Sequence, residues 1–280
     1  MSLIAILGAG AIGGALTHRL AARGRVGEVR LIDTEGTIAQ GKALDILQSS
    51  PIESFTTRVS SANVVEAAAG ADVIVIADAA KGDVEHADVH GLALVRKVAA
   101  METAAPLLFA GASQRQLMAR TVGELHVAAA RVVGSAAGAL ESALRAITAL
   151  EVDSSGVEIQ LRIVGVPPRD VVIAWEEATA FGQPISAVIP PHRLAAIGAR
   201  VPGIWPPGPL ALASAAARIA EAIAEGSRRR FTCFVSLDRP PARGNIVAMP
   251  AQLGPRGVER VLPPALSRLE QTRFENGLET

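Results

Sequence analysis

The stretch LIAILGAGAIGG, residues 3–14, decides the fold of this chain. The apolar run Leu3–Leu7 is followed by the pattern G-x-G-x-x-G, with glycines at positions 8, 10 and 13. A strand, a glycine-rich turn and a helix in this order are typical of a dinucleotide-binding βαβ unit. The chain contains 26 glycines, so the flanking strand and helix, rather than the glycines alone, support this interpretation.

Each glycine of the pattern has a separate expected role. Gly8 permits the tight turn, Gly10 lets the backbone approach a pyrophosphate, and Gly13 lets the helix pack closely on the strand. The helix amides, with Ala11 and Ile12 among them, would face the pyrophosphate, because the first turn of a helix has unpaired N–H groups. We therefore expect these five residues to bind a cofactor.

Asp33 lies twenty residues after Gly13, at the end of the second expected strand, 28–32. Its carboxylate is placed to accept both hydroxyls of an adenosine ribose, and it would repel a 2′-phosphate. No arginine follows it closely. The expected cofactor is therefore NAD rather than NADP, and the alternative is a vestigial glycine-rich turn without a ligand.

The first half of the chain alternates between short apolar runs and helical patterns. The run VIVI at 73–76 is apolar at every position, as in a strand that helices cover on both faces. Such alternation predicts a doubly wound parallel sheet. We expect strands at 3–7, 28–32, 56–59, 72–77, 105–110 and 131–133, and helices at 11–23, 36–48, 64–69, 88–100, 115–124 and 140–150.

The rhythm changes after about residue 150. The predicted α/β fold is a Rossmann domain, a doubly wound parallel sheet over residues 1–137, followed by a mixed α+β substrate and oligomerisation domain over 138–280. The second domain is expected to contain a hairpin (157–164 and 171–174), a long helix (210–225), a small antiparallel sheet (230–236, 245–250 and 257–261) and a terminal helix (264–277).

Composition narrows the classes of partner. Lys plus Arg equals Asp plus Glu at 27 each, so no net charge would attract nucleic acid or an anionic membrane. The apolar runs are too short to span a bilayer. The lone cysteine, Cys233, cannot form an internal disulfide, which suits a reducing compartment. We expect a cytoplasmic protein with a small-molecule ligand, and no membrane or nucleic-acid partner.

These segments resemble the lactate/malate dehydrogenase family nearly from end to end. VRLID at 29–33 and AQGKALD at 39–45 are similar to the family's VLVDI and AQGKALDL, and GQPI at 182–185 resembles its GIPI. VAMPAQLG at 247–254, with GVE at 257–259, resembles VGVPVVLG and GVE. The resemblance implies NAD as hydride carrier, a 2-hydroxy or 2-oxo acid substrate, and a homodimer or homotetramer.

The catalytic residues of the family are not matched. The His of its GGHGD turn corresponds to Pro167, and the Asp and Arg of its LDSAR motif correspond to Glu141 and Leu144. The loop that carries two arginines is shortened to 79–84, and Gly111 replaces the Asn of SNP. General acid–base help is worth roughly 10²–10⁴ in rate, so ordinary malate or lactate turnover is expected to be very weak or absent.

Two groups of residues are candidates for a substitute catalytic site. His86 lies four residues before His90, so on a helix the two would face the same way, as a replacement acid/base or as two metal ligands. The alternative is a solvated helix start, and no metal is expected. Glu141, Arg145 and Arg169 are placed to line the old substrate cleft, where arginines would suit an anionic substrate; the alternative is ordinary surface ion pairs.

Three functions remain open at this point. The first is an NAD-dependent oxidoreductase of malate/lactate dehydrogenase type with an altered substrate and proton relay. The second is a non-catalytic NAD-binding protein that serves as a partner subunit or redox sensor. The third is an interaction protein whose nucleotide site is a relic.

Overall fold

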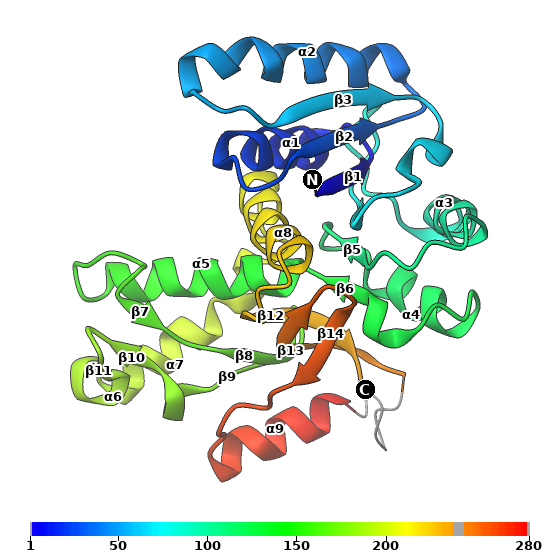
Figure 1. Cartoon of the computed structure of the whole chain (residues 1–280). Helices are drawn as coiled ribbons and strands as arrows, with labels where there is room; N and C mark the ends of the chain where they lie inside the picture. Colours follow the sequence, from blue (N-terminus) through cyan, green and yellow to red (C-terminus); the bar gives the residue numbers. More distant parts are fainter. Residues whose placement is uncertain (1, 238–243, 279–280) are drawn as a thin grey trace.

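The computed structural model describes residues 2–237 and 244–278, in which a large twisted sheet carries helices on both faces (Figure 1). The first six strands are parallel and have the order 3-2-1-4-5-6. This order reverses between the first and fourth strands, where doubly wound folds bind dinucleotides. The strands are β1 (Leu3–Leu7), β2 (Glu28–Ile32), β3 (Arg58–Ala62), β4 (Val73–Ile76), β5 (Leu107–Phe109) and β6 (Val132–Gly134).

Helices connect these strands as the sequence predicts. Leu16 and Leu20 are fully buried on the first helix, and every residue of β4 is buried, so the parallel sheet forms the core of the first half. The connecting elements are α1 (Ala11–Arg23), α2 (Gly36–Glu53), η1 (Val65–Ala68), α3 (Asp88–Ala100), α4 (Arg115–Gly123), η2 (Ala129–Arg131) and α5 (Ala136–Leu150). The predicted Rossmann fold is confirmed.

The three strands expected to form a small antiparallel sheet do pair antiparallel, and they are joined to the parallel sheet. Strand β12 (Arg230–Ser236) pairs antiparallel with β6 through Phe234 and Gly134, so it continues the parallel sheet. A Cβ at position 134 would lie 2.9 Å from the Cβ of Phe234, and the glycine therefore makes this close pairing possible. The extended sheet continues through β13 (Ile246–Gly254), β8 (Ile163–Val166) and β9 (Asp170–Ile173), with β14 (Gly257–Val261) also paired to β13.

The remaining elements surround this extension. A second sheet contains three very short strands. These are β7 (Ile159–Gln160), β10 (Thr179–Ala180) and β11 (Gln183–Pro184), and the other elements are η3 (Trp175–Glu177), α6 (Ile185–Val188), α7 (Pro191–Ala199), η4 (Val201–Ile204), α8 (Pro209–Ala224) and α9 (Arg268–Leu278). Within the described ranges, no helix combines the length and apolarity needed to cross a bilayer.

Some predicted boundaries were wrong. The third strand begins at Arg58 rather than at 56, because the buried Thr57 hydroxyl donates to the Val26 carbonyl and belongs to the preceding turn. Residues 65–68 form a 3₁₀ helix rather than an α-helix. Helix α5 begins at Ala136, four residues earlier than predicted, because its first turn is made of buried small residues that carry no amphipathic signal.

An ion pair joins the Rossmann helix α1 to α8, which lies beside it (Figure 1). The carboxylate of Glu221 on α8 accepts hydrogen bonds from Arg23 Nε (2.5 Å) and Nη2 (2.9 Å). The Glu221 side chain is only 3% exposed, and its hydrogen bonds raise the pKa of Arg23 above its usual value. The two halves of the chain are thus fastened at the C-terminal end of α1, away from the glycine-rich turn.

We expect Glu221→Ala to lower the free energy of unfolding by about 1–2 kcal/mol, because the partly buried Arg23 guanidinium loses its partner. Urea titration followed by circular dichroism measures this change. Glu124→Ala is the matched control, since it breaks an exposed i,i+4 pair with Arg120 and should leave the midpoint unchanged. Equal midpoints for both variants would contradict the role assigned to the α1–α8 pair.

Candidate functional site

The glycine-rich turn has the expected form. Gly8 has φ +112°, a conformation that favours glycine, and its amide donates to the Ile32 carbonyl at 2.7 Å. A Cβ at Gly13 would overlap the Gly8 carbonyl oxygen, so helix α1 leaves the turn as closely packed as predicted. Lys42 braces the turn from α2, donating from Nζ to the carbonyls of Ala9 (2.6 Å) and Gly10 (3.0 Å).

The amides at the start of α1 are hydrogen-bonded to Asp78, which follows β4. Asp78 Oδ2 accepts from the Ile12 amide and Oδ1 from the Gly13 amide, each at 2.9 Å. The backbone carbonyl of Asp78 accepts from the Gly10 amide, and a Cβ at Gly10 would overlap the Asp78 carboxylate. Asp78 is only 1% exposed. Three of the amides at this turn, those of Gly10, Ile12 and Gly13, are therefore already paired within the chain.

Asp33, the expected ribose-binding residue, is also paired with the backbone. Its Oδ2 accepts from the amides of Ala9 (2.8 Å) and Ala80 (2.9 Å), and its Oδ1 accepts from the Glu35 amide (2.9 Å). Burial by itself would raise the pKa of this carboxyl, but the three amide hydrogen bonds outweigh it and lower the pKa below its usual value. The side chain is thus a structural acceptor in this arrangement.

Residues 78–86, which we call the closure segment, fold back on the end of β4. Asp78 and Glu85 form an isolated antiparallel bridge, and the Ala79 amide donates to the Val84 carbonyl at 2.8 Å. The His86 amide donates to the Ala77 carbonyl at 3.0 Å. The shortened loop predicted at 79–84 is therefore a tight turn held against the carboxyl edge of the sheet.

Glu85 fastens the far side of the closure segment. Its carboxylate accepts from the amides of Ala112 (2.9 Å) and Ser113 (2.7 Å) and from the Ser113 hydroxyl (2.5 Å). These residues follow β5, and a Cβ at Gly111 would overlap the Glu85 carboxylate. The space beside Gly111, where the resemblance implies an Asn side chain, is filled by Glu85.

His86 lies inside the cleft rather than on the helix surface. Burial lowers the pKa of its imidazole, and the nearby carboxylates of Asp33 and Asp78 oppose this effect. Helix α3 begins only at Asp88, so the expected common helix face of His86 and His90 is wrong, and His90 is exposed. Across the described ranges, no group of three or more His, Cys, Asp or Glu side chains is placed to hold a metal ion.

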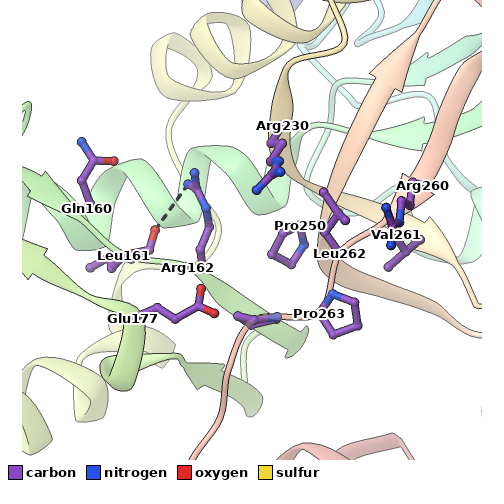
Figure 2. A pocket seen from close by; sticks show the side chains of 11 residues that line it. Gln160, Leu161, Arg162, Glu177, Arg230, Pro250, Arg260, Val261, Leu262 and Pro263 are labelled. Atoms are coloured by element: carbon purple, nitrogen blue, oxygen red, sulfur yellow. Dashed lines mark hydrogen bonds between the residues drawn. The ribbon is translucent and has the colours of Figure 1, made fainter.

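Glu141 on α5 is paired away from the proton-relay position. Its carboxylate accepts from Arg162 Nη1 at 2.7 Å and from the Thr232 hydroxyl. Burial raises the pKa of this carboxyl, and the Arg162 charge only partly opposes the rise. Arg162 itself lines a separate pocket of about 520 Å³ with Arg230 and Arg260 (Figure 2). Glu141 therefore forms part of an internal ion pair beside this pocket.

The other candidate positions are dispersed. Pro167 is buried in the turn between β8 and β9, and Arg169 in the same turn is exposed. Leu144 is fully buried in the apolar core of the second half. Arg145 donates from Nε to the Ile159 carbonyl (2.7 Å) and from Nη2 to a second backbone carbonyl, which places its guanidinium on the backbone of the following loop.

Two residues were not singled out from the sequence: Asp78 at the glycine-rich turn and Arg162 at the separate pocket. Asp78 carried a usable signal, because a carboxylate directly after a buried central strand lies at the sheet edge beside the glycine-rich turn. Arg162 carried none, because its pairing with Glu141 depends on how α5 packs against the second half of the sheet.

Comparison with known proteins identifies the family. Residues 2–83 match the NAD-binding domain of lactate/malate dehydrogenase. The chain is 31% identical to the malate dehydrogenase of Roseobacter denitrificans over 98% of this chain and 93% of the relative. It is 29% identical to the malate dehydrogenase of a Roseiflexus species over 99% and 95%. The chain therefore belongs to the lactate/malate dehydrogenase family of NAD-dependent oxidoreductases.

Solved structures agree on the fold. The lactate dehydrogenase of Cryptosporidium parvum, complexed with lactic acid and NAD, has a TM-score of 0.87 at 21% identity, covering 99% of this chain and 95% of that one. The malate dehydrogenase of Salinibacter ruber has a TM-score of 0.84 at 23% identity, covering 99% and 94%. Residues 2–83 thus belong to an NAD-binding domain by family, and the fold of the chain is that of these dehydrogenases.

The residues expected to bind NAD suit a dinucleotide by type, and several of them are hydrogen-bonded within the chain. The phosphate-binding amides of α1 are bonded to Asp78, and the Asp33 carboxylate accepts from three backbone amides. A cavity of about 40 Å³ lies beside Asp33 and His86, and larger pockets of about 390 Å³ and 610 Å³ lie beside Gly10 and Ala11 and beside Thr34 and Glu35. In this arrangement the Ile12 and Gly13 amides are not free to bind a phosphate.

We expect Asp33→Asn to lower the free energy of unfolding by about 1–3 kcal/mol at neutral pH, because an amide nitrogen cannot accept the hydrogen bonds that the carboxylate accepts. Since the folded-state pKa is lowered, the contribution of Asp33 is present above its unfolded-state pKa, near ~3.9, and is lost as the pH falls through the lower folded-state value.

Urea titrations of wild type and Asp33→Asn from about pH 7 to about pH 3 measure this difference, which should shrink in acid. Asp45→Asn, an exposed carboxylate on α2, is the control and should match the wild type throughout. A difference between wild type and Asp33→Asn that grows as the pH falls would refute the assignment.

Proposed function

We propose that this chain is a non-catalytic member of the lactate/malate dehydrogenase family that serves as a partner subunit or redox sensor. The observation that carries the proposal is the buried Pro167 at the position of the family's catalytic His. Proline has no titratable group, so no side chain at this position can exchange a proton with the substrate oxygen.

The substrate clamp is lost as well. Leu144 is fully buried at the position of the arginine that binds the substrate carboxylate. A carboxylate brought there would lack a partner, and an unpaired buried charge costs about 3–5 kcal/mol. The retained acid, Glu141, is paired with Arg162 and Thr232 instead of facing Pro167. These losses support the absence of malate and lactate turnover.

One observation favours a second candidate function, an NAD-dependent oxidoreductase with a new acid/base group. His86 is partly buried in the cleft, and burial lowers the pKa of its imidazole. Perturbed titratable groups in clefts are candidates for proton transfer. In this alternative His86 would exchange a proton with an anionic small molecule. Arg169, which is exposed in the turn between β8 and β9, would supply a positive charge. For either function we expect a homodimer or homotetramer.

Wild-type protein is expected to consume no NADH above the blank rate with any member of a panel of 2-oxo acids, aldehydes and imines. Loss of general acid–base help alone removes roughly 10²–10⁴ in rate. Absorbance of NADH, followed for hours at high protein concentration, measures turnover. Steady consumption with one substrate would end the non-catalytic proposal, and its loss in His86→Ala would favour the second candidate.

A further inference from the structure

We propose that Asp78 is a built-in occupant of the phosphate-binding turn, so that a dinucleotide binds only after the closure segment has left. This inference deepens the proposed function, and it rests on the family's cofactor site lying at the start of α1.

The start of α1 suits the Asp78 carboxylate chemically. The start of a helix favours anions, because its first amides are unpaired and the helix dipole is positive there. The Asp78 carboxylate offers one oxygen to each of the Ile12 and Gly13 amides at 2.9 Å. It therefore makes the contacts that a phosphate oxygen would make. A diphosphate cannot use the same amides while this carboxylate is present, and the two anions would repel each other.

Asp78 reaches the start of α1 from a distant part of the chain. The residue preceding α1 is Gly10, which has no side chain to cap the helix, whereas an ordinary capping side chain comes from the N-cap itself. Asp78 is 66 positions away from Ile12 along the chain and comes from the end of β4. Strands β1 and β4 flank the point where the strand order reverses, and this is where a dinucleotide crosses the sheet edge.

The closure segment is held in place at separate points. Asp33 accepts from the Ala80 amide on one side, and Glu85 accepts from Ala112 and Ser113 on the other. Together with Asp78, these carboxylates pair the backbone amides that line the cleft. Opening the site would break several hydrogen bonds to charged groups at once, so the closed state is the stable one.

The test is calorimetric titration of wild type and Asp78→Ser with NADH and with ADP-ribose. Asp78→Ser removes the competing charge and frees the amides of Ile12 and Gly13. Since a hydrogen bond to a charged group is worth at least about tenfold in an equilibrium constant, Asp78→Ser should bind both probes at least about tenfold more tightly than wild type.

Asp72→Ser is the matched control. Its carboxylate also accepts a backbone amide, from Leu3 at 2.8 Å, but at the opposite end of β4. The affinity of Asp72→Ser for both probes should equal that of wild type. If Asp78→Ser fails to fold, Asp78→Asn retains one acceptor and removes the charge, and it should also gain affinity.

The outcomes separate this inference from the proposed function. Equal affinity of wild type and the Asp78 variants would overturn the inference and leave the proposed function standing. Tighter binding by the Asp78 variants would support the inference whether or not turnover is found. Turnover by wild type would overturn the proposed function alone.

Discussion

The close approach of the glycine-rich turn to the end of β4 is the constraint on which this edge of the molecule depends. Side chains at Gly8, Gly10 or Gly13 would overlap backbone or carboxylate atoms of the neighbouring segments. Their absence lets the Asp78 carboxylate reach the first amides of α1. The glycines of a dinucleotide-binding motif thus serve an internal hydrogen-bond network here, while the fold around them remains that of the family.

The sequence predicted the local elements well where a strong signal ended in a clear breaker. The bounds of β1, α1, α3, β12 and β14 agree with the structure residue for residue, because apolar runs or helical periodicity end there at turn residues. The antiparallel pairing of β12, β13 and β14 was also predicted, but its junction with the parallel sheet was not. The pairing between β6 and β12 joins residues 100 positions apart, Gly134 and Phe234, and no local pattern encodes it.

The position of the site was predictable from the sequence, but the hydrogen bonds within it were not. The spacing of the glycines and Asp33 correctly indicated the edge of the sheet and the class of domain, and the family match confirms that class. The hydrogen bonds of Asp78 and Glu85 depend on how the closure segment folds back on β4, which a reading of local patterns could not supply. The fingerprint therefore identifies the class of domain, whereas the partners of its first amides depend on the closure segment.

Hydrogen exchange at the Ile12 and Gly13 amides, measured by NMR, tests the central claim most directly. The account predicts that both amides are protected without any dinucleotide, because Asp78 accepts from them, and that adding NADH leaves their protection unchanged. Rapid exchange of these amides in the free protein, slowed by NADH, would contradict it.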